Sequence, residues 1–250
     1  MDKKIRVGAV SYLNTKPLLF GLKRSGLMDR ITLFEDYPSH IASMLLNDDI
    51  DIGLVPVVMI PIMKEAHILT DYCIGAEGEV ASVALFSEVP IDQVSKVILD
   101  FQSRTSVILA KVLLKEFWKK EVEWIHVTED FGEHIKGNTA GIVIGDRALD
   151  QRKLSAYFYD LAGAWKEHTG LPFVFAAWVS NKPLEADFID AFNLANGYGV
   201  THIDEVIAET PYERCNYDLQ AYYTQNISYH FDDLKKAGMA LFLKKAEGVL

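Results

Sequence analysis

The order of apolar segments at the start of the chain constrains the fold more than any other feature of the sequence. Short apolar stretches typical of buried strands, residues 5–10, 30–38 and 49–57, alternate with segments typical of helices, 17–23 and 39–49. We expect Ser39 to cap the second of these helices. This βαβαβ order predicts a parallel, doubly wound sheet with right-handed crossovers.

A second series of the same kind follows. The pattern predicts helices over 105–118 and 161–170, the latter ending at Gly170, and strands over 95–101, 122–127, 140–146 and 171–180. Two α/β units joined by extended crossings near 82–88 and 174–181 would make a two-lobed α/β protein. We expect a first lobe of residues 1–85 and 179–250 and an inserted second lobe of residues 86–178, with a ligand cleft between them.

Three polar clusters interrupt this apolar pattern, each at a junction between a strand and a helix. They span residues 11–16, 100–106 and 145–149. The first N–H groups of a helix lack partners within the helix and lie at its positive dipole end, so such junctions suit an anion such as a carboxylate. One helix cap needs one hydroxyl or amide, whereas residues 103–106, "SRTS", supply three hydroxyls and a guanidinium. We therefore expect this cluster to bind a ligand.

Other residues leave two interpretations open. Asp146 and Arg147 are equally typical of a functional pair and of a turn with a surface ion pair. The Ser82 hydroxyl fits a position facing the cleft as well as one satisfied by the backbone. Trp165 and Trp178 are expected in the core, as are the tyrosines of a C-terminal stretch without clean periodicity: Tyr212, Tyr217, Tyr222, Tyr223 and Tyr229.

Composition excludes several classes of function. A net charge of −10 and the lack of a long Lys/Arg run argue against a nucleic-acid partner. No phosphate-loop or dinucleotide-binding motif occurs, and the seven histidines form no metal-binding pair. Cys73 and Cys215 are expected as structural thiols in a reducing compartment. The sequence has no signal-peptide pattern and no apolar run long enough to span a membrane, so we expect a cytoplasmic protein without a membrane partner.

Seven segments in one order resemble the chorismate dehydratase family of the futalosine route to menaquinone. They are "VSYLNTKPL", "LVPV", "GEVASVALFSEVPI", "LDFQSRTSVILAKVLL", "IGDRAL", "DLAGAW" and "TGLPFVFAAW", and the likeness covers residues 5–180 and, more loosely, the helical tail. The resemblance implies a type II periplasmic-binding-protein-like fold. It also implies loss of water from chorismate, giving 3-[(1-carboxyvinyl)oxy]benzoate without metal or organic cofactor.

The resemblance also assigns residues. Asn14 would be the main active-site amide and Ser82 a catalytic cleft hydroxyl. The residues expected to bind the substrate are Ser11, Tyr12, Ser103, Arg104, Thr105, Ser106, Gly145 and Asp146. Because the junction clusters contain no His or Glu as an obvious base, we expect the enolpyruvyl carboxylate of chorismate to remove the ring proton, held in place by Asn14.

Two alternatives remain at this stage. One is the 1,4-dihydroxy-6-naphthoate synthase of the same pathway and fold, although the paired "SYLN" and "SRTS" segments favour the dehydratase. The other is a receptor that binds a carboxylate solute without catalysis. Oligomeric state has no signature in the sequence.

Overall fold

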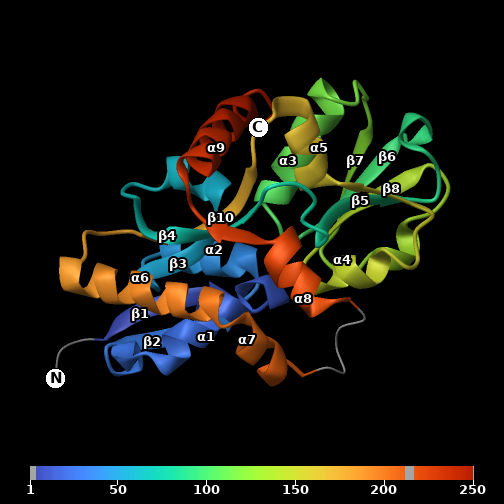
Figure 1. The fold of residues 1–250 in the computed structure, drawn as a ribbon. Helices are drawn as coiled ribbons and strands as arrows, with labels where there is room; N and C mark the ends of the chain where they lie inside the picture. Colours follow the sequence, from blue (N-terminus) through green and yellow to red (C-terminus); the bar gives the residue numbers. More distant parts are fainter. Residues whose placement is uncertain (1–3, 212–216, 250) are drawn as a thin grey trace.

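The computed structural model describes residues 4–211 and 217–249, and in this part of the chain the strands form two sheets, one in each lobe (Figure 1). The first lobe contains a six-stranded sheet in the order β11-β4-β10-β3-β1-β2. One half of this sheet is the predicted parallel unit, in which β1 pairs with β3 on one side and with the edge strand β2 on the other. Its strands are β1 (Ile5–Val10), β2 (Ile31–Asp36), β3 (Ile52–Pro56), β4 (His67–Ala76), β10 (Phe173–Ser180) and β11 (Ser228–His230).

The second lobe contains a five-stranded sheet in the order β7-β6-β8-β5-β9. The strand β6 runs parallel to both β7 and β8, whereas β5 runs antiparallel to β8 and β9. The strands are β5 (Val83–Ser87), β6 (Lys96–Leu99), β7 (Glu123–His126), β8 (Thr139–Ile144) and β9 (Tyr157–Asp160).

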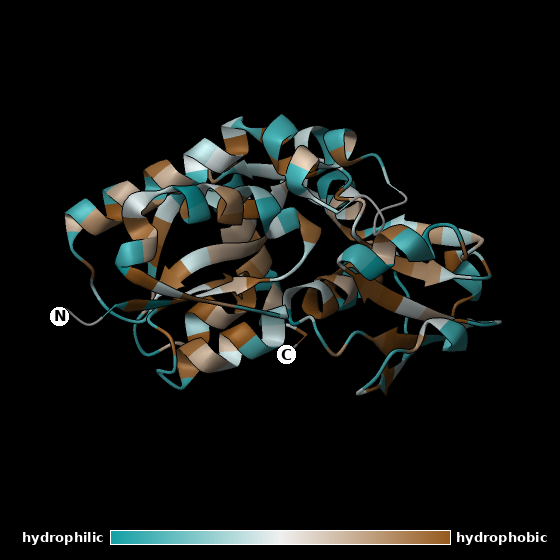
Figure 2. Ribbon diagram, turned by 90° about the horizontal axis from the view of Figure 1, so that it is seen from below, coloured by the Kyte–Doolittle hydropathy of each residue, from teal (hydrophilic) through white to brown (hydrophobic). Residues whose placement is uncertain are grey.

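Helices pack against both sheets and cover their apolar faces (Figures 1 and 2). The helices α1 and α6 pack with their backbones in contact, because Gly21 and Gly199 carry no side chain: a Cβ on Gly21 would lie 1.7 Å from the Ala195 carbonyl oxygen. The helices are α1 (Lys16–Arg24), α2 (Pro38–Leu46), α3 (Thr105–Glu116), α4 (Asp146–Gln151), α5 (Leu161–Thr169), α6 (Ala186–Thr201), α7 (Ile203–Glu209), α8 (Leu219–Ala221) and α9 (Asp233–Ala246).

The crossings between lobes differ from the prediction. Segments 82–88 and 174–181, expected to cross, contain β5 and β10, which are internal strands of the second and first sheets. Both are apolar and almost entirely buried, so they form core rather than connections. The chain instead passes between the sheets at 77–82, between β4 and β5, and again at 161–172, between β9 and β10. The expected domain boundaries therefore fall inside strands, and we propose boundaries near residue 82 and between β9 and β10.

Some local expectations are confirmed and one is wrong. Gly170 ends α5 in the left-handed conformation, with φ of 75°. Ser39 does not cap α2, because the helix begins at Pro38 with Tyr37 as its N-cap, and the Ser39 hydroxyl faces the Phe101 carbonyl oxygen at 3.5 Å. A proline in the first helical turn thus sets the start of this helix.

Most of the aromatic residues predicted in the core are buried there. They are Trp165, Trp178, Tyr222, Tyr223 and Tyr229. Tyr217, also expected in the core, is only partly buried and packs against the core. Tyr212 and Cys215 lie outside the described residues, and Cys73 is a buried free thiol. Among the described residues, no helix combines the length and apolar character needed to cross a lipid bilayer.

Candidate functional site

The three polar clusters predicted from the sequence meet in one pocket between the lobes. The carboxyl ends of β1, β6 and β8 lead into the clusters, and parallel strands place these ends along one edge of each sheet. The cavity has a volume of about 50 Å³. It is lined by Val10, Tyr12, Asn14, Thr15, Pro38, Pro56, Ile74, Val80, Val83, Ser103, Thr105, Ser106, Ile144, Gly145, Phe175 and Ala176.

The first wall of the pocket is the 3-10 turn Leu13–Thr15, which joins β1 to α1. The Asn14 side-chain oxygen accepts a hydrogen bond from the Thr15 hydroxyl at 3.2 Å, and the Asn14 main-chain oxygen accepts one from the Tyr229 hydroxyl at 2.9 Å. Within the described part of the chain, the Asn14 amide nitrogen has no hydrogen-bond acceptor. The side-chain oxygen and the main-chain oxygen of Asn14 are therefore both held, while the amide N–H groups are available to a ligand.

The second wall is the amino end of α3. Here the Ser103 hydroxyl accepts from the Ser106 N–H at 3.1 Å. The Thr105 hydroxyl is buried and has no partner among the described residues, although Thr105 lines the pocket. A buried hydroxyl without a partner is unfavourable in the absence of ligand, so its presence at a helix N-terminus indicates a site for an acceptor, such as a carboxylate oxygen.

Four predicted site residues do not line the pocket. Ser11 is exposed, and Ser82 is fully buried with its hydroxyl accepting from Tyr222 at 2.8 Å. The Arg104 guanidinium turns toward α2, where it donates to the Ser43 hydroxyl at 3.4 Å. Asp146 adjoins the pocket through Gly145.

The described lining therefore has no charged side chain. Donors available to an anion are hydroxyls, the Asn14 amide and main-chain N–H groups. Among all the described residues, His, Cys, Asp and Glu side chains form no group of three or more that could hold a metal ion.

Hydrogen bonds from both lobes close the pocket. The Leu13 N–H donates to Asp146 Oδ1 at 3.0 Å, and the Tyr12 hydroxyl donates to Gln102. Burial raises the pKa of the Asp146 carboxyl above its ordinary value, against the opposing effects of the Leu13 N–H and Lys16. Burial likewise raises the pKa of the Tyr12 phenol, so it remains a protonated donor.

An arginine outside the lining supports this closure. The Arg147 guanidinium pairs with the buried Asp100 carboxylate at 2.6 Å and also donates to Gln102 at 3.2 Å. Arg147 and Asp146 therefore form no turn ion pair with each other. Gln102 joins Tyr12 to Arg147, and no spacing in the sequence marks it as a site residue.

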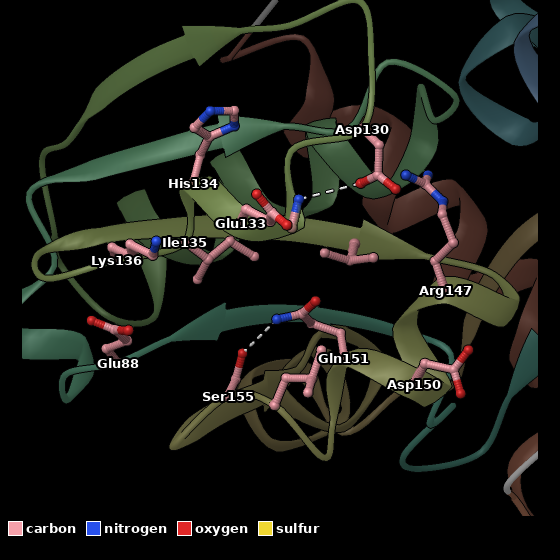
Figure 3. Close-up of a pocket in the computed structure, with 13 residues that line it drawn as sticks. Glu88, Asp130, Glu133, His134, Ile135, Lys136, Arg147, Asp150, Gln151 and Ser155 are labelled. Atoms are coloured by element: carbon pink, nitrogen blue, oxygen red, sulfur yellow. Dashed lines mark hydrogen bonds between the residues drawn. The ribbon is translucent and has the colours of Figure 1, made fainter.

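A larger cavity of about 590 Å³ lies elsewhere, entirely on the second lobe (Figure 3). Charged side chains such as Glu133, Lys136 and Asp150 project around it, with Arg147 at its border. Of the described residues that line this cavity, only Arg147 belongs to a junction cluster. We place the candidate site in the interlobe pocket, where the three clusters meet.

Comparison with known proteins shows the family of this chain. The model of a family described as menaquinone biosynthesis matches residues 5–248, nearly the whole chain. The chain belongs to this family. A chorismate dehydratase from Thermus thermophilus is 27% identical over 259 residues, with 94% of this chain and 93% of the relative covered.

Solved structures with the same fold are similar over the whole chain. A protein from Archaeoglobus fulgidus has a TM-score of 0.77 at 14% identity, covering 99% of this chain and 98% of the other. The periplasmic aliphatic sulphonate binding protein from Escherichia coli has a TM-score of 0.61 at 12% identity, covering 99% and 86%. The two-lobed periplasmic-binding-protein-like fold predicted from the sequence is thereby confirmed.

Proposed function

We propose that this chain removes water from chorismate, giving 3-[(1-carboxyvinyl)oxy]benzoate in menaquinone biosynthesis. Membership of the family and a relative named chorismate dehydratase support the reaction. The observation that carries the proposal is the interlobe pocket, whose polar groups are neutral donors placed on opposite walls. A dianion with two separated carboxylates matches this arrangement.

Each wall would bind one carboxylate of chorismate. The amino end of α3, with the Thr105 hydroxyl and main-chain N–H groups, suits the ring carboxylate. The Asn14 amide on the opposite wall suits the enolpyruvyl carboxylate. Hydrogen bonds to a charged acceptor are stronger than those between neutral groups, so neutral donors suffice to hold a dianion in a protein of net charge −10.

The reaction needs one proton transfer and one bond cleavage. The proton leaves the ring carbon that bears the ether oxygen, and the C–O bond of the neighbouring hydroxyl breaks as its electron pair leaves with oxygen. The electrons of the C–H bond form the new ring double bond, which completes an aromatic ring. The base that removes the proton passes it to the departing hydroxide, which leaves as water.

The base in this scheme is the substrate itself. The described pocket lining offers no carboxylate, imidazole or amine side chain to accept the proton. The enolpyruvyl carboxylate is joined to the carbon that loses the proton through the ether oxygen and one vinyl carbon, and Asn14 would hold it close to that proton. The protein then contributes orientation and stabilises the negative charge that the ring carboxylate takes up.

Substrate entry requires the two lobes to move apart. A cavity of about 50 Å³ is far below the roughly 300–1,000 Å³ of typical ligand pockets. We infer that the lobes separate to admit chorismate and close again through the Leu13–Asp146 and Tyr12–Gln102 contacts.

Titration with chorismate, followed by aromatic absorbance, separates the enzyme from a receptor. We expect the wild-type protein to generate a new aromatic chromophore over many turnovers. Asn14→Ala should lower kcat by about 10²–10³-fold, the effect of removing one donor at a developing charge, and Ser82→Ala should also lower it. Asn138→Ala, on the exposed surface of the second lobe, is the matched control and should leave kcat unchanged. Saturable binding of chorismate without any new absorbance would contradict the proposal and favour a receptor.

A further inference from the structure

Two buried tyrosines from the C-terminal segment contact Asn14 and Ser82, the two residues that the family resemblance assigns to catalysis. The Tyr229 hydroxyl donates to the Asn14 main-chain oxygen at 2.9 Å, and the Tyr222 hydroxyl donates to the Ser82 hydroxyl at 2.8 Å. These bonds join positions 215 and 140 residues apart in the chain. Tyr229 is 4% exposed and Tyr222 is fully buried, and neither lines the pocket.

The fold fixes where both tyrosines lie. The strand β11, which carries Tyr229, is the edge strand of the first sheet and pairs with β4. Tyr222 begins the π-helical turn η7 (Tyr222–Asn226), a rare geometry that occurs frequently at functional sites. At the end of this turn the Asn226 amide donates to the Glu79 main-chain oxygen at 3.1 Å, which attaches the segment to the crossing that leads to Ser82.

Tyr229 completes the support of the turn that presents Asn14. On one side of the turn, the Leu13 N–H is held by Asp146 of the second lobe. On the other side, the Asn14 carbonyl is held by Tyr229. Burial raises the pKa of the Tyr229 phenol well above its ordinary value, so it stays a protonated donor throughout the range in which the protein would work.

Tyr222 supports the opposite part of the pocket. With the Ser82 hydroxyl occupied as an acceptor, its own proton is free to be donated elsewhere. The Ser82 main-chain oxygen accepts from the Gly145 N–H at 2.8 Å, and Gly145 lines the pocket against the Tyr12 ring. A displacement of Ser82 would therefore reach the pocket lining.

We propose that Tyr229 and Tyr222 are positioning residues that act from outside the pocket. Tyr229 sets the turn that presents the Asn14 amide, and Tyr222 sets Ser82 and, through the Ser82 main-chain oxygen, Gly145 of the pocket lining. The proposal rests on the proposed function. It gives the tyrosine-rich C-terminal segment a role in the reaction beyond its place in the core.

Double-mutant cycles test this directly, with kcat and KM measured for chorismate. We expect Tyr229→Phe to lower kcat about tenfold with KM nearly unchanged, because one hydrogen bond is lost and the amide is misplaced by less than the roughly 1 Å that costs about a hundredfold. In an Asn14→Ala background, Tyr229→Phe should have no further effect on kcat. Tyr222→Phe should behave in the same way toward Ser82→Ala.

Tyr159→Phe is the matched control. Its hydroxyl accepts from the Ile91 N–H at 2.7 Å in the second lobe, away from the pocket, so its loss should lower stability but not kcat. The proposal is overturned if Tyr229→Phe retains wild-type kcat, or if its loss is equally large in the Asn14→Ala background, which would indicate a general structural effect. A wild-type protein without turnover would overturn the proposed function and this inference together. The wild-type measurement therefore separates that outcome from a failure of the inference alone.

Discussion

Replacing Thr105 by valine should stabilise the ligand-free protein while weakening its hold on substrate. Thr105 is 2% exposed, and its hydroxyl has no partner in the described part of the chain. An unsatisfied buried hydroxyl costs about 1–3 kcal/mol, and valine fills nearly the same volume without that cost. We therefore expect the free energy of unfolding to rise by about 1 kcal/mol. The lost hydrogen bond to a substrate carboxylate is worth about 1.5–3 kcal/mol, which predicts a KM raised by roughly 10- to 150-fold.

Urea unfolding gives the stability and steady-state kinetics gives KM. Thr70→Val is the matched control, since the Thr70 hydroxyl is buried in β4 with two main-chain partners, accepting from the Tyr72 N–H and donating to the Tyr72 carbonyl. This control should lose stability and keep its KM. A Thr105→Val protein that is less stable than wild type, or that keeps the wild-type KM, would refute the assignment of this hydroxyl to the ligand.

Three further predictions concern the frame of the pocket. Gly145→Ala should cost more stability than Gly137→Ala by about 1–3 kcal/mol in urea unfolding: both glycines have positive φ, but only at Gly145 would a Cβ lie 2.9 Å from the Tyr12 ring. Asp146→Asn should remove a pH dependence of the free energy of unfolding. The pKa of Asp146 is raised in the folded protein, so the folded state binds a proton more tightly than the unfolded state. The stability of the wild type relative to the variant should therefore fall as pH rises from the ordinary value of 3.8 through the raised pKa, and a constant difference would contradict this. Asp160→Asn should lower the free energy of unfolding by about 1.5–3 kcal/mol, since each carboxylate oxygen accepts main-chain N–H groups and an amide retains only one such oxygen; an unchanged midpoint would contradict it.

The sequence predicted those parts of the fold that depend on local pattern. The apolar strands and the polar junctions after β1, β6 and β8 are visible as short stretches of sequence, and parallel pairing brings the ends of such strands together. That is why Asn14, Thr105 and Gly145 could be expected in one pocket before the structure was known.

What could not be predicted depends on contacts between distant segments. The direction of the Arg104 side chain is set by α2 of the other lobe, and the membership of β10 in the first sheet is set by its antiparallel pairing with β3 and β4. Tyr229 lies 215 residues from Asn14, and no periodicity marks it as a partner. A tyrosine in the core and a tyrosine that supports a catalytic amide have the same appearance in sequence.

Identifying the product of wild-type protein and chorismate by mass and proton NMR tests the central claim most directly. The account predicts a compound lighter than chorismate by one water, with an aromatic ring carrying the carboxyvinyl ether in the position meta to the carboxylate. Its formation should depend on Asn14. Recovery of unchanged chorismate after prolonged incubation with folded protein would contradict the account, as would a product that has lost the enolpyruvyl group instead of water.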